Sequence, residues 1–183
     1  MFLLQGSLHD KSGHVADASI INNGIVISGG KLTFPNNGYA TIAAGSLPDT
    51  VLCDGHDWTI EASVTITQLN QYNHMTVFGR DPSPRGDISI KQGGEVYYNM
   101  GGGNHIEKSN TGIIGEHTIK VTHTSSNAFM LYVDGAAGSI TDGSGVVASR
   151  NYRGYDLAIG YNFDGRYFTP NAINWLRISD CIR

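Results

Sequence analysis

The pattern of hydrophobic and polar residues is most informative in three stretches of the chain, at residues 58–67, 116–135 and 157–177. In the first stretch, WTIEASVTIT, the apolar Trp58, Ile60 and Val64 are separated by polar residues such as Glu61 and Ser63. Successive side chains of a β-strand point to opposite faces. The pattern therefore predicts a ten-residue strand with one buried face and one solvated face.

The second stretch predicts a β-hairpin. Ile119 and Val121 face inward before a polar turn at residues 124–127, and Phe129 and Leu131 face inward after it. Together, the three stretches predict an antiparallel β-sandwich. The residues expected to be buried together are Trp58, Ile60, Val64, Ile119, Val121, Phe129, Leu131, Val133, Leu157, Ile159, Leu176 and Ile178.

Short strands separated by turn residues fill the rest of the chain. Asn-Gly, Asp-Gly and Gly-Gly pairs mark the reversals, and no segment has helical periodicity beyond a single turn around Ala44–Leu52. Of the adjacent Tyr97 and Tyr98, one faces the core. Two irregular loops, Arg80–Gly86 and Gly101–Gly112, are expected to carry binding residues. The short strands are expected at Gly24–Ser28, Lys31–Phe34, Tyr39–Ala43, Ile88–Gln92 and Glu95–Met100.

The composition fits one all-β domain over residues 1–183. The 24 glycines agree with frequent tight turns, and 40% of the residues are hydrophobic, which suffices for one core. A net charge of −4 with only 15% charged residues argues against nucleic acid as a partner. Apolar runs are too short for membrane insertion. Residues 1–6 lack the features of a signal peptide, so we expect either another route of export or a chain that begins after the signal.

A series of short motifs follows one order along the chain. They are DKSGH at residues 10–14, LTF at 32–34, TIEASV at 59–64, HTIKVT at 117–122 with LYVDG at 131–135, LAIG at 157–160 and INWLRI at 173–178. From Leu8 to Ser179 this series resembles the laminin-G-like branch of the concanavalin A-like lectin/glucanase superfamily. The resemblance implies a jelly-roll sandwich of two curved antiparallel sheets, usually a binding or structural module.

The resemblance also implies a structural Ca²⁺ site. Asp10 matches the family's N-terminal ligand, and Asn174 stands where the family has an aspartate in its last strand. Asparagine keeps an oxygen ligand but removes a charge, which weakens binding of a hard cation. The alternative is that Asp10 caps a turn through its own backbone.

Aromatic residues gather before the last strand and predict a glycan site. Tyrosine rings suit the mixed surface of a sugar, and neighbouring amide, carboxylate and guanidinium groups bind hydroxyls. The alternatives are that Tyr161 closes the end of the core, that Tyr155 packs in a turn, or that the patch contacts a neighbouring subunit. The candidate glycan-binding residues are Tyr155, Tyr161, Asn162, Asp164, Arg166 and Tyr167.

Nothing in the sequence supports catalysis. Glycoside hydrolases need paired carboxylates, and no second carboxylate follows Glu61 on its face of the strand. No G-x-S-x-G elbow is present, and the seven histidines are dispersed. Arg85-Gly86-Asp87 spells the integrin tripeptide, but Asp87 begins an evident strand. We expect neither an enzyme nor an integrin ligand.

The two cysteines leave two alternatives open. Cys53 precedes the Trp58 strand and Cys181 follows the last strand, so a disulfide would close a long loop and contribute about 4–5 kcal/mol. Two reduced thiols are the other alternative, since no framework of four or six cysteines exists.

We therefore expect a non-enzymatic recognition or structural module. A chain that starts at Met1 without a signal peptide and is rich in Gly, Asn, Ser and Thr favours a virion protein, such as a phage tail fibre or capsid-decoration protein. Its expected partners are a cell-surface glycan, other virion proteins and itself, as a homo-oligomer and more specifically a trimer. The expected location is the virion surface or the extracellular space. The alternative is a carbohydrate-binding module of a secreted bacterial protein.

Overall fold

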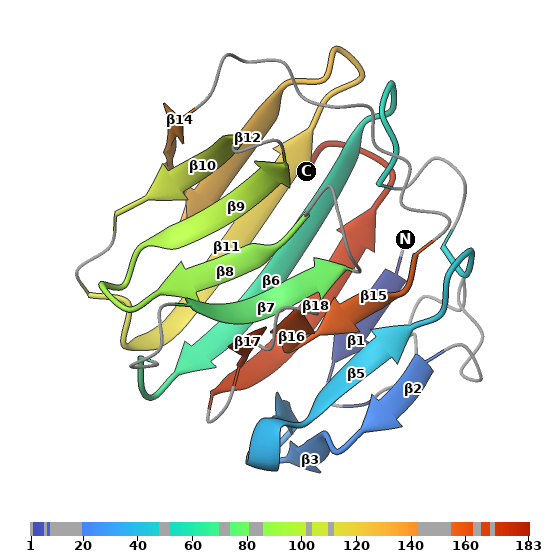
Figure 1. Cartoon of the computed structure of the whole chain (residues 1–183), viewed down its shortest axis with the longest axis vertical. Helices are drawn as coiled ribbons and strands as arrows, with labels where there is room; N and C mark the ends of the chain where they lie inside the picture. The colour runs from blue at the N-terminus through green and yellow to red at the C-terminus, as the bar shows by residue number, and fades with distance from the viewer. Residues whose placement is uncertain are drawn as a thin grey trace.

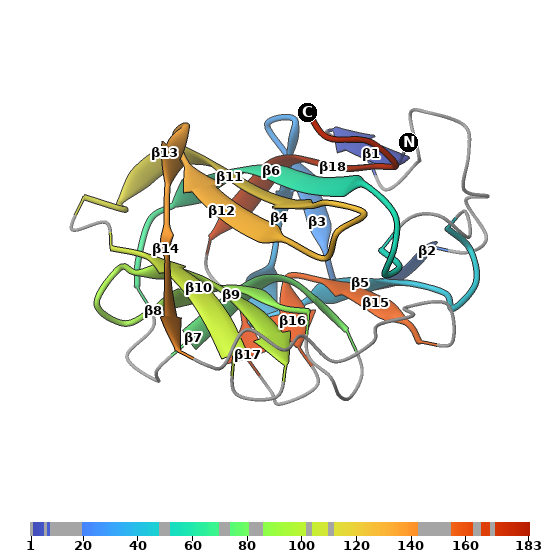
Figure 2. The same cartoon turned by 90° about the horizontal axis from the view of Figure 1, so that it is seen from above.

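Two antiparallel β-sheets pack face to face to form the molecule (Figures 1 and 2). A computed structural model describes residues 2–5, 7, 20–47, 52–69, 74–80, 86–101, 104–109, 112–142, 155–162, 166–168 and 171–183. No α-helix occurs in these ranges. The predicted fold class, an antiparallel β-sandwich of two sheets, is confirmed.

The first sheet has the order β13-β12-β11-β6-β18-β4-β3, and β1 pairs with the second half of β18. The long strands β6 and β11 pair along their whole length and form its centre. Its strands are β1 (Phe2–Gln5), β3 (Val26–Ser28), β4 (Lys31–Thr33), β6 (Trp58–Ile66), β11 (Gly115–His123), β12 (Phe129–Val133), β13 (Ala136–Ala137) and β18 (Ala172–Ser179).

The second sheet has the order β14-β10-β9-β8-β7-β15-β5-β2. Its strands are β2 (Ile20–Asn23), β5 (Tyr39–Ile42), β7 (His74–Arg80), β8 (Ile88–Lys91), β9 (Val96–Gly101), β10 (Asn104–Lys108), β14 (Ser139–Asp142) and β15 (Leu157–Ile159). A two-stranded hairpin of β16 (Tyr161–Asn162) and β17 (Arg166–Tyr167) leaves β15 and packs against β7 on the outer side of this sheet (Figure 2).

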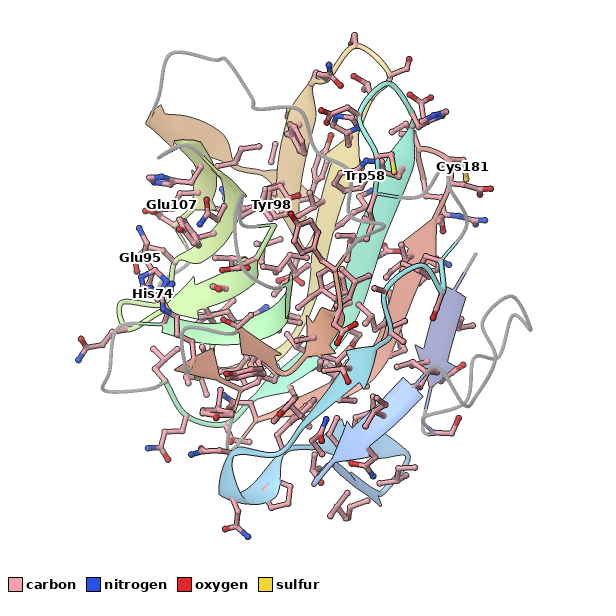
Figure 3. The ribbon with its side chains drawn as sticks, turned by 45° about the vertical axis from the view of Figure 1, so that its right-hand side comes forward. Trp58, His74, Glu95, Tyr98, Glu107 and Cys181 are labelled. Carbon is pink, nitrogen blue, oxygen red and sulfur yellow. The ribbon has the colours of Figure 1, made fainter. Side chains whose placement is uncertain are left out.

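The core lies between the sheets where the alternation of the sequence places it. Every residue predicted to be buried is buried, and the most exposed of them, Phe129, is at 5%. Trp58 and Tyr98 both lie inside the sandwich (Figure 3). The Trp58 ring stacks on His123 at 4.9 Å between centroids and meets Phe129 edge-on at 5.8 Å.

The predicted hairpin is confirmed, and so is the prediction that one of the two adjacent tyrosines faces the core. β11 and β12 form the hairpin, and Asn127 in the turn has a φ of 63°, a conformation that asparagine tolerates well. Tyr98 is fully buried, and Tyr97 points to the outer face.

The face of β6 that was predicted to be solvated is partly covered. Thr59 and Ser63 are 1% and 4% exposed. Thr59 Oγ1 donates a hydrogen bond to the carbonyl of Cys181, and Ser63 Oγ accepts one from Asn174. The C-terminal strand and the residues after it therefore cover polar groups that the alternation alone assigns to water.

One local prediction was wrong. The predicted loop Gly101–Gly112 contains β10, because Ile106 faces the core while His105 and Glu107 face outward. The helical turn expected around Ala44–Leu52 stays a prediction, because residues 48–51 are outside the described part; a 3₁₀ turn that was not predicted occurs at Pro35–Asn37.

The structure contains no disulfide between Cys53 and Cys181, so the alternative of two reduced thiols is the one it adopts. Cys53 is buried and Cys181 half-buried. Among the residues described, no helix is long and apolar enough to cross a membrane.

Candidate functional site

Gly160 directs the chain from β15 onto the outer side of the second sheet. Its φ is +77°, and a Cβ there would lie 2.2 Å from the Phe34 ring. Its amide donates to the carbonyl of Val77 on β7, and its carbonyl accepts from the amide of Phe168. Phe168 is fully buried and meets Phe34 edge-on at 5.8 Å between centroids. These contacts anchor both ends of the β16–β17 hairpin.

Three half-exposed tyrosines gather where the hairpin meets β5. The Tyr161 ring stacks on Tyr167 at 4.7 Å between centroids and lies 4.6 Å from the ring of Tyr39. Tyr39 and Tyr167 are 6.4 Å apart. We call Tyr39, Tyr161 and Tyr167 the tyrosine cluster. It presents aromatic surface and phenol groups on the outer side of the second sheet.

The structure brings together part of the predicted glycan site. Tyr161, Arg166 and Tyr167 share the hairpin, and Asn162 pairs with Arg166 in its ladder. Tyr155 lies before β15, at the strand's other end from Tyr161. It is half-buried, and the neighbouring carboxylate of Asp156 accepts from the amide of Ala44. Tyr155 is thus separated from the cluster by the length of β15.

Asp164, the remaining predicted glycan residue, lies outside the described residues. Tyr39 completes the cluster but was missed from the sequence. The strand containing Tyr39 was predicted, but its pairing with β15, which brings Tyr39 to Tyr161, was not.

A second group of side chains occupies the outer face of β7 to β10. Tyr97 is at its centre: the His74 ring meets it edge-on at 5.3 Å, the His105 ring lies at 5.0 Å, and Lys91 Nζ lies 5.3 Å from its centroid. Lys91 also forms an ion pair with Glu107. We call His74, Lys91, Tyr97, His105 and Glu107 the outer-face patch.

The strand register explains why five residues from four strands meet. His74 is opposite Lys91 across β7 and β8, and Tyr97 is opposite Glu107 across β9 and β10. All occupy positions that alternate with core residues, so they point away from the sandwich. Figure 3 shows His74, Glu95 and Glu107 together on this side of the molecule. None of these residues was a predicted glycan ligand. The prediction relied on aromatic residues that cluster in the sequence, and of these five residues only Tyr97 has an aromatic neighbour there, Tyr98.

Cationic groups surround His74. Burial lowers the pKa of His74 below its usual 6.5, and the charges of Arg166 and Lys91 lower it further, while Glu107 acts in the opposite direction. His105 adds a smaller lowering effect. Arg166 belongs to the β16–β17 hairpin, so the charge that lowers the pKa of His74 comes partly from outside the outer-face patch.

Asn174, the predicted calcium ligand, lies on the outer face of the first sheet. Its Oδ1 accepts from Thr65 Oγ1 at 3.0 Å, and its Nδ2 donates to Ser63 Oγ at 2.9 Å. Lys31 Nζ donates to the same Thr65 hydroxyl at 2.9 Å. Asp10 is outside the described residues, which contain no group of three or more His, Cys, Asp or Glu side chains suited to a metal. Calcium binding stays a prediction.

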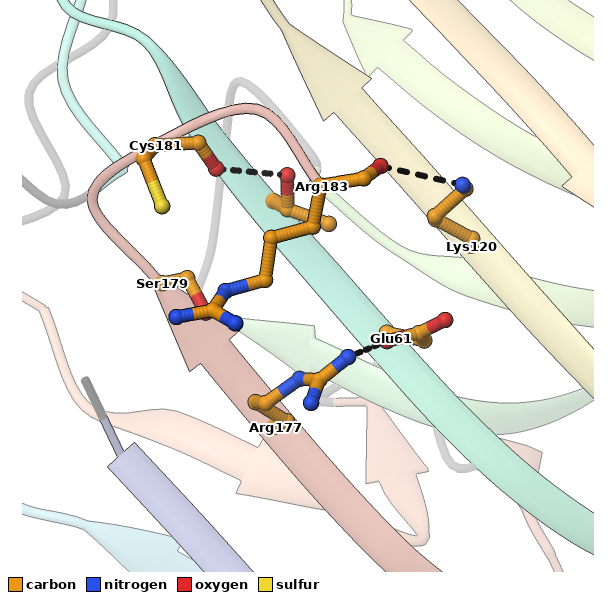
Figure 4. A network of polar contacts seen from close by, with 7 residues as sticks. Glu61, Lys120, Arg177, Ser179, Cys181 and Arg183 are labelled. Atoms are coloured by element: carbon orange, nitrogen blue, oxygen red, sulfur yellow. Dashed lines mark hydrogen bonds and ion pairs between the residues drawn. The ribbon is translucent and has the colours of Figure 1, made fainter. Parts of the chain in front are cut away.

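The outer face of the first sheet is held by its own polar contacts (Figure 4). Arg177 forms an ion pair with Glu61, the glutamate of the Trp58 strand. The C-terminal residues extend this network: Lys120 Nζ donates to the carbonyl of Arg183, whose Nε donates to Ser179 Oγ. The carboxylate of Glu61 therefore has a structural partner.

Asp87 of the Arg-Gly-Asp tripeptide is 1% exposed, immediately before β8. A buried aspartate is a poor recognition element for a receptor. Arg85 lies outside the described residues.

No protein-family model and no curated protein matches this sequence. Solved structures share its fold. The binding domain of botulinum neurotoxin serotype D superposes with a TM-score of 0.69 at 12% identity, over 99% of this chain and 48% of that one. Trypanosoma rangeli sialidase in complex with sialic acid gives 0.68 at 11% identity, over 100% and 31%. The serotype G binding domain gives 0.65 at 14% identity, over 100% and 48%.

The chain thus spans about a third to a half of these larger chains. At such low identity the likeness shows the fold alone, a β-sandwich. It singles out neither the concanavalin A-like superfamily nor its laminin-G-like branch, and both stay predictions.

Proposed function

We propose that the chain is a non-enzymatic, surface-exposed recognition module that binds a glycan on the outer side of its second sheet. The observation that carries this proposal is the tyrosine cluster, with three half-exposed rings within 6.4 Å of one another beside Arg166. Tyrosine offers an apolar ring to the C–H groups of a sugar and a hydroxyl to its oxygens. Arg166, the neighbour of Tyr167 in β17, adds charged, directional donors on the same hairpin.

The rigidity of the support favours binding. The hairpin is fixed by the hydrogen bonds of Gly160 to Val77 and Phe168 and by the burial of Phe168. A preformed site loses less conformational entropy when it takes up a ligand. The solved complex of the sialidase with sialic acid supports the proposal by showing that a chain containing this fold binds a sugar, although that chain is about three times as long.

Mutation of Tyr167 tests glycan binding. We expect Tyr167→Ala to weaken binding to the glycans that the wild-type protein selects on an array by roughly tenfold, or about 1.4 kcal/mol. Tyr132→Ala is the matched control: Tyr132 is also half-buried, lies on the outer face of the first sheet and has Lys120 Nζ 4.9 Å from its ring centroid. Tyr155→Ala should also preserve binding. Equal losses of glycan affinity in all three variants would contradict the assignment of the site to the tyrosine cluster. An array on which the wild-type protein binds no glycan would overturn the proposed function.

As the setting of this module we propose the virion surface, as part of a tail fibre or capsid decoration, with the secreted carbohydrate-binding module as the alternative. Exposed apolar residues on two edge strands support assembly: Ile21 on β2 and Val26 and Ile27 on β3 are 50%, 49% and 48% exposed. Edge strands with apolar side chains favour pairing between chains. Light scattering should give three times the 19.7 kDa of one chain. A monomer at micromolar concentration would favour the secreted module.

A further inference from the structure

We propose that the glycan is acidic, and that its carboxylate or sulfate group binds at the outer-face patch, between Arg166 of the hairpin and the side chains of His74, Lys91 and His105. This inference rests on the proposed glycan function and adds to it the chemical class of the ligand and a second subsite. The tyrosine cluster would hold the sugar ring, and the patch would hold the charge.

Donors from three strands meet around the Tyr97 ring, and a fourth belongs to the hairpin that packs against β7. Arg166 comes from β17, His74 from β7, Lys91 from β8 and His105 from β10, and the last three contact the Tyr97 ring at centroid distances of 5.0 to 5.3 Å. Charged and imidazole N–H donors arranged around one point form stronger hydrogen bonds to an anion than to a neutral hydroxyl. The arrangement is therefore selective for charge.

Two carboxylates lie on this side of the molecule, and one of them is paired within the patch. Glu107 pairs with Lys91, and its Oε2 lies 3.8 Å from His105 Nε2. Glu95 lies in the β8–β9 turn with its carboxylate folded over Gly93. The Nδ1 atom of His74 is buried and has no hydrogen-bond partner among the described residues. A buried polar atom without a partner carries a free-energy cost, so no hydrogen bond from the described residues fixes this edge of the ring.

Binding of an anion here should depend on pH. In the free protein the pKa of His74 is lowered by burial and by Arg166 and Lys91, so the ring is neutral at pH 7. The groups that face it are Arg166 from β17, Lys91 from β8, Tyr97 from β9, and His105 and Glu107 from β10. An anion beside the ring would raise this pKa, so binding takes up a proton. The affinity then increases as the pH falls from 7.5 towards 5.5.

Calorimetry with three related sugars tests the inference. We expect sialyllactose, which carries a carboxylate, or sulfated lactose to bind roughly tenfold more tightly than neutral lactose, with the difference larger at about pH 5.5 than at 7.5. Preference for one acidic sugar over the other would identify the charged group. In proton NMR, titration with the preferred sugar should raise the pKa of His74.

Variants of the patch separate its role from that of the tyrosines. Lys91→Gln and His74→Gln should lose the preference for the acidic sugar and keep the affinity for lactose, and His74→Gln should also lose the pH dependence. Lys120→Gln, on the outer face of the opposite sheet, is the matched loss of charge and should change nothing. Equal binding of neutral and acidic sugars at both pH values would overturn the inference and leave the glycan function standing. No binding of any sugar, on the array or in calorimetry, would overturn both.

Discussion

The outer faces of the two sheets use their polar residues differently. On the first sheet, hydrogen bonds and ion pairs join neighbouring strands: Glu61 with Arg177, and Asn174 with Ser63 and Thr65. On the second sheet, aromatic and titratable side chains such as His74 and Tyr97 contact each other mainly through their rings. A hairpin lies beside them. The first face joins its strands by side-chain hydrogen bonds and an ion pair, whereas the second gathers ring surface around Tyr97 together with the Lys91–Glu107 ion pair.

This contrast has a physical origin in the partners available to each strand. β6 lies between the long strands β11 and β18. It pairs with β11 without interruption, and the one register shift in its pairing with β18, between Ile173 and Trp175, leaves Asn174 hydrogen-bonded to Ser63 and Thr65. Around Tyr97 the strands are shorter, and register shifts interrupt the pairing of β10 with both of its neighbours. Such irregularities often redirect side chains towards a functional surface.

The largest loss of stability is expected from a substitution in the core, which supports the outer faces of both sheets. Trp58→Ala should lower the free energy of unfolding by about 3–5 kcal/mol, since the stacking on His123 and the contact with Phe129 are lost in a closed interior. The chain's other tryptophan provides the control. Trp175 is half-buried on the first sheet with Arg177 5.6 Å from its ring, so Trp175→Ala should cost about 1 kcal/mol or less. Denaturant titration measures both losses of stability. Equal losses in the two variants would show that Trp58 and Trp175 are wrongly assigned to the core and to the outer face.

A smaller loss of stability is expected from Gly160→Ala, which should displace the β16–β17 hairpin on the second sheet and leave the first sheet unchanged. Gly160→Ala places a Cβ 2.2 Å from Phe34 and a non-glycine residue at a φ of +77°. Gly135→Ala has nearly the same φ, +80°, but nothing within 4 Å of its Cβ. Both variants pay about 1 kcal/mol for the left-handed backbone, and Gly160→Ala should cost a further 1–3 kcal/mol or so through the clash.

Glycan binding extends this comparison. Displacement of the hairpin should weaken binding in Gly160→Ala and leave it unchanged in Gly135→Ala. Equal stabilities, with binding preserved in both, would mean that Phe34 moves aside and that the hairpin does not depend on this contact.

The smallest effect should come from the first face. The side chains of Arg177 and Glu61 are 30% and 15% exposed, so solvent screens their interaction. Arg177→Gln combined with Glu61→Gln should lower stability by about 1 kcal/mol or less and leave glycan binding unaltered. A double-mutant cycle measures the coupling between the two groups. A loss of binding here would mean that the first face also takes part in recognition.

The alternation of Trp58, Ile60 and Val64 predicted the fold well, because a strand's period of two records directly which side chains are buried. The same rule failed for residues 101–112, where a strand with one inward residue, Ile106, resembles a polar loop. The outward side of β6 was also mispredicted, since alternation gives the direction of a side chain but not what covers it.

The candidate site was predictable only where its residues are close in sequence. Tyr161, Arg166 and Tyr167 stood out because they lie within one short segment. Tyr39, His74 and Tyr97 reach the same face from separate strands, and their meeting depends on strand order and register. A single sequence with isolated outward residues does not specify either.

The positions of the two termini determine which sheet is exposed when the molecule is attached to a surface through either end. β1 and the C-terminal residues both belong to the side of the first sheet (Figure 2), where β1 pairs with β18 and Lys120 contacts Arg183. A tether attached at either end would therefore pull on the first sheet and turn the second sheet outward. Immobilisation on a sensor through a terminal tag would display the tyrosine cluster, whereas coupling through surface lysines would put Lys91 at risk of modification and block the patch.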